Sequence, residues 1–409
     1  MTKFYLKSLI HAMGKIIELR LDNPSVRYAL LVLMCRFLSC QSILEIAFNY
    51  GIPKDRFYRS VHKLKSFTQL NALRRNGIRR LVDVLKELKK ASAATKSRNQ
   101  VIICVDDLAE KTRGILGGLS LTCWNGAEKR VLQSVNSQLL VAVIGDTGQV
   151  ILLDTRFVLP NHEGPGKQPA KKTEWFLESI QRLNESLKRF GVSLNGCIVS
   201  VDSAYAFKGI CDLLREWKVP LVSQVHGGRV IQGLVASGLE LRGIAKPILS
   251  AWIGLNQDNW KKMDNEEDVE YLRATMESNK LGKIAIIARK NSNGVRFLFS
   301  TEIDLKAKTI HRAARRRWKL ERVFWDWKQR AGMEDIHFHD MEACLACWYR
   351  QLILIQVLKD LGFHNRISVG ELCRNLKLNS KEIFDGILYG SAFSLDENSN
   401  SVPILKEVA

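Results

Sequence analysis

The chain has 409 residues, of which 46% are hydrophobic and only 8 are proline, and this composition excludes a disordered or fibrous protein. Its length predicts two or three domains. The net charge is +20, and residues 1–100 contribute +14 of it, with 20 Lys and Arg against 6 Asp and Glu. A strongly basic N-terminal region ahead of a nearly balanced body indicates a polyanionic partner, either nucleic acid or an anionic membrane.

A membrane is the weaker of these two partners. The longest uninterrupted apolar stretch, residues 28–35, is far shorter than the roughly 20 residues that a membrane-spanning helix needs. Three lysines interrupt the first 15 residues, which is not the pattern of a secretory signal. The Cys-x-x-Cys pair Cys344/Cys347 has no second pair or histidine cluster to complete a zinc site. We therefore expect a cytoplasmic protein with buried thiols, a nucleic-acid partner and no membrane association.

Residues 1–98 are expected to form a helical DNA-binding domain, because apolar residues recur there at three- and four-residue spacing. Within it, residues 42–64 resemble a helix-turn-helix, in which one helix ends at Gly51 and the next has Pro53 in its first turn. The second helix would present four basic side chains to DNA: Lys54, Arg56, Arg59 and Lys63. The alternative is a three-helix packing domain whose basic face is only solvated.

From residue 99 onwards, short apolar runs alternate with helical segments. The expected elements are strands at 101–105, 137–144 and 150–158, a helix at 173–190, a strand at 196–202, a helix at 205–217 and a strand at 220–225. Three antiparallel strands followed by strand–helix–strand units predict an α/β fold, with a mixed sheet flanked by helices.

Residues 226–302 interrupt this alternation with strand-like runs separated by turn residues, so we expect a β-rich insertion there. The sheet domain would then consist of a first part, residues 99–225, and a second part, residues 303–362. The remaining tail, residues 363–409, has no pattern that predicts a function. Two long helices are expected in the second part, at roughly 306–330 and 341–361.

Two carboxylates stand where buried strands are expected to end. Asp106 follows the strand at 101–105, and Asp202 closes the strand at 196–202. A single aspartate in such a place is most often a loop cap. If the two strands are neighbours, however, both carboxylates converge at the sheet edge where α/β proteins place their ligands. Oxygen donors without an accompanying His or Cys would favour Mg²⁺ or Mn²⁺ over zinc.

A third candidate carboxylate lies in the helix expected at 306–330. Arg317, Glu321 and Lys328 are spaced so that they share one helical face, beside an apolar stripe that would dock the helix. Glu321 could bind a metal ion while the two cations hold phosphates. The alternative is an ordinary amphipathic helix with ion pairs on its solvated face. For Trp318 and Trp325 we favour core packing over stacking on unpaired bases.

Taken together, these motifs resemble the bacterial insertion-sequence DDE transposases, which have a ribonuclease H-like core with a β-rich insertion. Their signature is Tyr-x2-Arg-x3-Glu-x6-Lys, and the spacing of Arg317, Glu321 and Lys328 matches it, with Ala314 in place of the tyrosine. Residues 202–205 resemble the Asp-x-x-Tyr motif around the second catalytic aspartate. Residues 102–107 resemble the first strand, where Leu108 replaces the threonine of Asp-x-Thr, so either Asp106 or Asp107 could be the first ligand.

The resemblance, which covers roughly residues 100–361, implies a chemistry and a set of partners. Asp106, Asp202 and Glu321 would hold two Mg²⁺ ions, with Mn²⁺ as a substitute, while Arg317 and Lys328 would contact phosphates near the scissile bond. The protein would cut double-stranded DNA at transposon terminal inverted repeats and join the ends to target DNA. It would act as a homodimer on the nucleoid of a prokaryotic cell. Two alternatives are another ribonuclease H-like nuclease or resolvase, and a catalytically inactive DNA-binding protein derived from a transposase.

Overall fold

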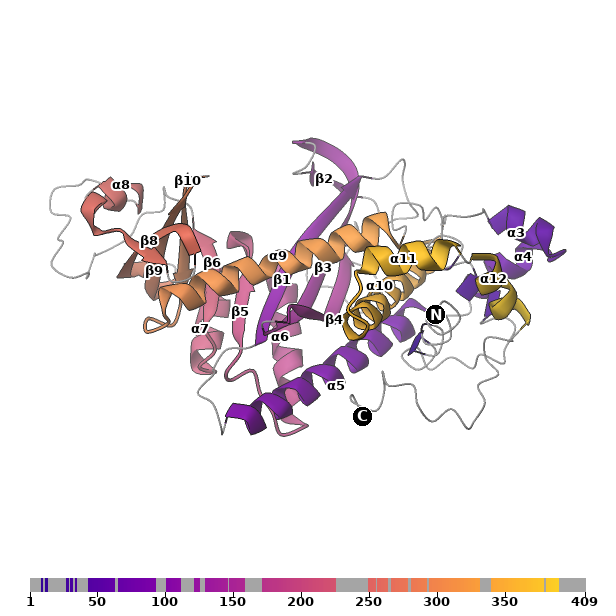
Figure 1. Ribbon diagram of the computed structural model, residues 1–409, viewed down its shortest axis with the longest axis horizontal. Coiled ribbons are helices and arrows are strands. Elements are labelled where there is room, and N and C mark those ends of the chain that lie inside the picture. Colours follow the sequence, from indigo (N-terminus) through magenta and orange to yellow (C-terminus); the bar gives the residue numbers. More distant parts are fainter. Residues whose placement is uncertain are drawn as a thin grey trace.

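The computed structural model describes most of the chain from residue 43 to residue 389, together with eight single positions between 9 and 34. The described ranges are 43–62, 65–92, 101–111, 121–125, 129–145, 147–158, 171–225, 249–254, 256–263, 266–278, 281–292, 294–331, 340–378 and 380–389. Within them, a ten-stranded mixed sheet is flanked by helices (Figure 1), which confirms the predicted α/β class and is consistent with a ribonuclease H-like transposase fold.

The first part of the sheet follows the predicted order of elements. β3 (Arg130–Ile144) pairs antiparallel with both β1 (Val101–Lys111) and β4 (Gln149–Val158). β5 (Ile198–Val201) is parallel to β1, and β6 (Leu221–Val225) is parallel to β5. A short strand, β2 (Leu121–Asn125), pairs with the start of β3. The central strands are apolar on both sides because helices cover both faces of the sheet.

The strands expected within residues 226–302 extend this same sheet. β7 (Lys261–Met263), β8 (Glu266–Ser278), β9 (Gly282–Asn291) and β10 (Gly294–Ser300) form an antiparallel meander. β10 also pairs antiparallel with β6, so hydrogen bonding continues from the first part into the meander. One short helix, α8 (Leu249–Gly254), precedes the meander in the chain.

Helices on the two faces of the sheet bury two separate cores. α9 (Ala307–Gln329) and α10 (Met341–His364) pack against the side chains of Ile102 and Cys104. α6 (Lys172–Lys188) and α7 (Lys208–Glu216) cover the opposite face, which includes Ile103. The expected docking stripe of α9 is confirmed, because three of its apolar side chains are buried: Leu320, Phe324 and Trp327.

A long N-terminal helix, α5 (Ser66–Ser92), packs against edge strand β4 and against α10 (Figure 1). A Cβ atom built on Gly77 would lie only 2.0 Å from the backbone oxygen of Leu152, so only glycine allows this close approach. Gln356 of α10 satisfies the open edge of β4: its Oε1 accepts from the Leu152 N–H at 2.7 Å, and its Nε2 donates to the Val150 oxygen at 3.1 Å. This edge is therefore closed to pairing with another strand.

The helix α10 is both long and apolar. By length and composition alone, α10 could cross a membrane. However, 89% of its most apolar window is buried inside the fold, as in the core helix of a globular protein. The short helices are α3 (Ile43–Asn49), α4 (Lys54–His62), α11 (Val369–Leu378) and α12 (Ser380–Tyr389).

Candidate active site

The register of two neighbouring parallel strands brings the predicted aspartates together. β1 pairs with β5 from Ile102↔Ile198 to Val105↔Val201. Asp106 and Asp202 are the residues that directly follow the last pair. Asp202 directly follows the end of β5, as expected. Asp106, in contrast, lies inside β1 rather than at its end, because β1 continues to pair with β3 for six residues after it leaves β5.

Asp106 and Asp107 have different partners on the two sides of β1. Asp106 forms an ion pair with Arg317 of α9. Asp107 instead forms an ion pair with Lys172 at the start of α6, with 3.3 Å between Nζ of the lysine and Oδ1 of the aspartate. Successive side chains of a strand point to opposite faces of the sheet, so Asp106 and Asp107, the two candidates for the first metal ligand, point in different directions. Asp106 is the one that faces α9.

One pocket of about 500 Å³ contains five of the predicted site residues. Asp106 and Asp202 come from the sheet edge, and the other three come from two turns of α9. The full lining is Asp106, Asp107, Leu108, Asp202, Arg317, Glu321, Phe324, Trp325 and Lys328. The three predicted carboxylate ligands therefore share one cavity with a fourth carboxylate, Asp107, and with two cations.

Arg317 is a buried residue that lines this pocket and contacts two of its carboxylates. One guanidinium nitrogen pairs with Asp106, and the other lies 3.9 Å from Oε1 of Glu321. Burial raises the pKa of Asp106 to about 6, although the charge of Arg317 acts in the opposite direction. Arg317 was expected to contact DNA phosphates, but in this arrangement its first partner is the carboxylate of the protein itself.

The donor set of the pocket fits a hard divalent cation, since it consists of carboxylate oxygens only. Among the residues that the structure describes, however, no three His, Cys, Asp or Glu side chains are grouped closely enough to hold an ion. Arg317 lies between Asp106 and Glu321 and supplies the positive charge there. Binding of a cation by all three carboxylates would therefore require them to draw together and Arg317 to release Asp106.

A polar chain behind Asp107 was not anticipated from the sequence. Gln138 of β3 donates from Nε2 to the hydroxyl oxygen of Tyr205 at 2.8 Å, and Arg156 of β4 donates to Gln138. The ammonium group of Lys172 lies 5.1 Å from the centre of the Tyr205 ring. Burial raises the pKa of Tyr205, so its hydroxyl stays protonated. Nothing in the local pattern around Gln138 or Lys172 distinguishes them from other polar residues.

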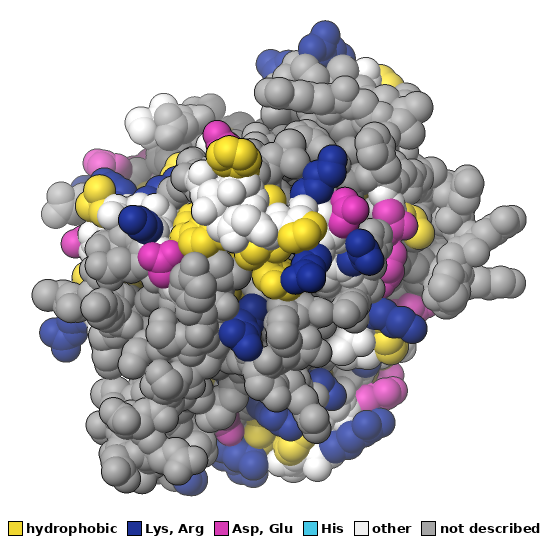
Figure 2. All heavy atoms as spheres, turned by 90° about the vertical axis from the view of Figure 1, so that its right-hand side faces the viewer, with side chains coloured by type: hydrophobic (Ala, Val, Ile, Leu, Met, Phe, Trp, Pro, Cys, Tyr) yellow, Lys and Arg dark blue, Asp and Glu magenta, His cyan; other side chains and the backbone are white. Residues whose placement is uncertain are grey.

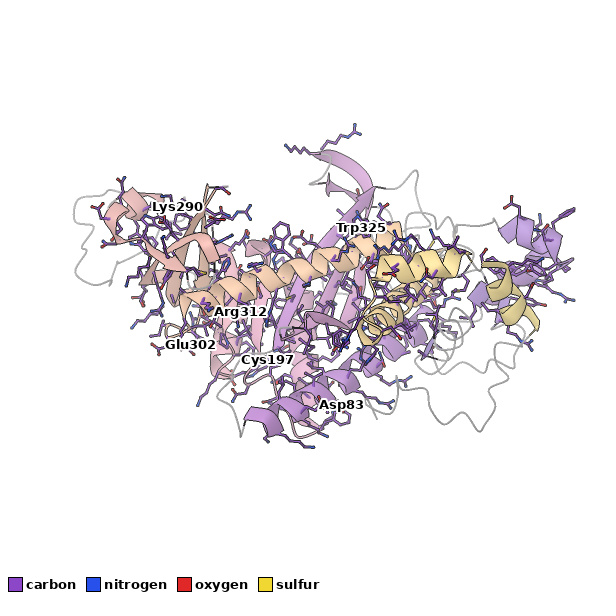
Figure 3. All side chains as sticks on the ribbon, in the orientation of Figure 1. Asp83, Cys197, Lys290, Glu302, Arg312 and Trp325 are labelled. Atoms are coloured by element: carbon purple, nitrogen blue, oxygen red, sulfur yellow. The ribbon has the colours of Figure 1, made fainter. Side chains whose placement is uncertain are left out.

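The preferred interpretation of two tryptophans as core residues was wrong. Trp318 is 53% exposed and Trp325 is 43% exposed, and both lie on the outer side of α9. The buried stripe of the helix is already filled by other apolar side chains, which leaves these positions facing away from the sheet. Trp325 also lines the pocket, and the guanidinium groups of Arg322 and Arg330 lie 4.3 Å and 4.7 Å from its ring centre. Figure 3 labels Trp325 near the C-terminal end of α9.

The expected helix-turn-helix elements are present as α3 and α4. The turn between them includes Gly51 with a φ of +61°, a conformation that favours glycine. Lys54, Arg56 and Arg59 are exposed on α4, whereas Lys63 lies outside the described residues. Figure 2 faces this end of the molecule and shows Lys and Arg side chains around a group of hydrophobic ones.

Asp340 caps α10, with its Oδ2 accepting from the Ala343 N–H at 2.7 Å. Cys344 and Cys347 are both buried, as expected.

Part of the chain resembles a known protein family. Residues 169–355 match the family model described as transposase DDE domain. The match covers somewhat less than half of the chain; it includes Asp202 and Glu321 and begins after Asp106. No curated protein matches the chain. The family match supports a DDE transposase and a transposase-type enzyme that acts on DNA, in a family that generally uses divalent metal ions.

Proposed function

We propose that this protein is a DNA transposase that cuts transposon ends and joins them to target DNA by two-metal-ion phosphoryl transfer. The observation that carries the proposal is the shared pocket of Asp106, Asp202 and Glu321, contributed by two neighbouring strands and by α9. The transposase DDE domain match over residues 169–355 supports it. The bacterial insertion-sequence class, with its Tyr-Arg-Glu-Lys spacing, is part of the same proposal.

The three carboxylates would hold two Mg²⁺ ions, or Mn²⁺ as a substitute. Bound there, these ions would activate the attacking water or DNA 3′-hydroxyl and stabilise the leaving oxygen. Lys328 lines the pocket beside Glu321 and would contact a phosphate next to the scissile bond. Arg317 would balance negative charge at the base of the pocket, shared between Asp106 and the DNA.

The proposed substrates are the element's terminal inverted repeats and the target DNA. The exposed cations of α4, Lys54, Arg56 and Arg59, would provide part of the grip on the duplex. Such contacts with phosphates weaken as salt is added, because DNA binding releases counterions. We further propose that two copies hold the two transposon ends together, and that the protein works in the cytoplasm of a prokaryote, on the nucleoid.

The decisive experiment is cleavage and strand transfer on duplexes that carry the element's terminal repeats, with Mg²⁺ or Mn²⁺. Wild type is compared with Asp202→Asn and Glu321→Gln, and with Glu302→Gln as a matched control. Glu302 is exposed and precedes α9 at the end of the helix opposite to Trp325 (Figure 3). The two site variants should lose both reactions but still bind the repeats, whereas the control should keep full activity.

Equal cleavage by wild type and by both site variants would refute the proposed site. Cleavage without any strand transfer in the wild type would instead indicate a nuclease or resolvase. Repeat binding without either reaction would indicate a DNA-binding protein derived from a transposase.

A further inference from the structure

The polar chain behind Asp107 crosses the sheet on the face opposite to α9. Gln138 of β3 is paired with Asp107 of β1 on one side and with Arg156 of β4 on the other (Figure 1). Because residues that pair across neighbouring strands point to the same face, these three side chains lie in line. Tyr205, in the turn that follows β5, completes the polar chain beside Asp107. Gln138, Arg156 and Tyr205 are all buried, so their hydrogen bonds hold them in one arrangement.

The chemistry of these groups fixes the direction of each hydrogen bond in the polar chain. A guanidinium group can only donate, so the bond from Nε of Arg156 makes Oε1 of Gln138 the acceptor. The amide nitrogen of Gln138 therefore donates to the hydroxyl oxygen of Tyr205, at 2.8 Å. This leaves the hydroxyl hydrogen of Tyr205 to be donated elsewhere. Burial is the main cause that raises the pKa of Tyr205, and the Asp107 carboxylate, which accepts from the hydroxyl, is the next.

Tyr205 and Asp107 are each tied to one of the proposed metal ligands. The backbone N–H of Tyr205 donates to the Asp202 carbonyl oxygen at 3.0 Å, so the ring is anchored in the same tight turn as that carboxylate. The backbone N–H of Asp107 donates to Oδ1 of Asp106, also at 3.0 Å. The hydrogen bond between Tyr205 and Asp107 therefore joins, from behind the sheet, the two chain segments that carry these ligands.

Packing alone does not account for the buried arginine at the far end of the polar chain. Burial lowers the pKa of Arg156 to about 10, because its charge is poorly solvated inside the fold. The guanidinium group lies 5.5 Å from the ring centre of Trp175, a contact that an apolar side chain could replace at lower cost. What an apolar side chain could not do is orient the amide of Gln138, and through it the hydroxyl of Tyr205.

We propose that Gln138, oriented by Arg156, is a positioning residue of the metal site and acts through the hydroxyl of Tyr205. By making Tyr205 donate to Asp107, it holds the two ligand-bearing segments at one separation, at which their carboxylates share a cation. Groups behind the ligands of a metal commonly change its affinity by about 10- to 100-fold. This inference rests on the proposed function and deepens it, because it names the residues that set the metal affinity of the pocket.

The test measures binding of Mn²⁺ by electron paramagnetic resonance, with the full chain bound to a duplex that carries the terminal repeat. Asp202→Asn gives the background of Mn²⁺ held by DNA. Tyr205→Phe removes the hydroxyl, whereas Gln138→Glu keeps the side-chain size and the contact with Arg156 but cannot donate to Tyr205. Asp107 is left unchanged, because an asparagine there would still accept from the hydroxyl. The matched control is Tyr349→Phe, the same change in a buried tyrosine of α10.

Tyr205→Phe and Gln138→Glu should each weaken Mn²⁺ binding by about 10- to 100-fold. Their cleavage should fall at low Mn²⁺ and recover at saturating Mn²⁺, while their affinity for the repeat duplex matches wild type. Tyr349→Phe should match wild type in all three measurements, and thermal unfolding checks that each variant is folded. An unchanged Mn²⁺ affinity in either variant, or a loss of cleavage that saturating Mn²⁺ does not restore, would overturn the positioning role.

The outcome is distinguishable from failure of the proposed function. If Asp202→Asn binds Mn²⁺ and cleaves as well as wild type, the metal site falls, and the positioning role falls with it. If Asp202→Asn loses both properties while Tyr205→Phe and Gln138→Glu bind Mn²⁺ as wild type does, the positioning role falls and the catalytic assignment stands.

Discussion

Replacement of Gly77 by alanine should destabilise this protein, although the same change stabilises most helices. Gly77 sits in the middle of α5, where the helix touches edge strand β4. An added Cβ would meet the backbone oxygen of Leu152 at 2.0 Å and the Cα of Leu153 at 3.2 Å. Ordinary contacts of a Cβ begin at about 3.4 Å, so the helix and the strand would have to separate by more than about 1 Å.

The strand cannot easily give way to the new methyl group. The amide of Leu152 is bound to Gln356, and the residue is paired in register with Val141 of β3. Overpacking of this kind costs about 1–3 kcal/mol, and we expect the upper part of that range because a whole helix must move. Alanine recovers about 1 kcal/mol of helix propensity. The net loss is therefore about 2 kcal/mol, or about 4–8 °C in melting temperature for a domain of this size.

Thermal unfolding followed by circular dichroism would measure this effect, with Lys86→Ala on the exposed side of the same helix as the control. The control should stay within about 0.5 kcal/mol of wild type. A Gly77→Ala variant that melts at a higher temperature than wild type would show that α5 does not lie on β4. The basic N-terminal region would then be separate from the sheet domain.

Three further substitutions test other parts of the structure. In the DNA cleavage assay, Asp106→Asn should abolish activity while Asp107→Asn retains it, because only Asp106 faces α9; the reverse result would transfer the site to Asp107. Asp326→Asn should lower the free energy of unfolding in urea by about 3–5 kcal/mol, since it leaves the buried cations Lys359 and Arg330 without their carboxylate. Burial lowers the pKa of Lys359 and Asp326 opposes this shift, so without Asp326 stability should rise as the pH approaches the ordinary lysine pKa. A loss below about 1 kcal/mol, or one that is independent of pH, would contradict the role of this network.

The elements that depend on local pattern were predictable from the sequence. The apolar run before Asp202 gives a strand that ends where expected, and the spacing of Arg317, Glu321 and Lys328 places them together on one helix. Both features follow from the fixed periods of strands and helices, which the order of residues determines directly. The meander within residues 226–302 was predictable for the same reason.

Other features depend on which segments meet, and only the tertiary structure decided them. Alternation along β1 separates Asp106 from Asp107, but the choice between them needed the position of α9 on one face of the sheet. Trp318 and Trp325 have the composition of core residues, yet their burial depends on whether another element covers that side of the helix. Local periodicity fixes the direction of a side chain relative to its own element, whereas contacts between distant segments determine what that side chain meets.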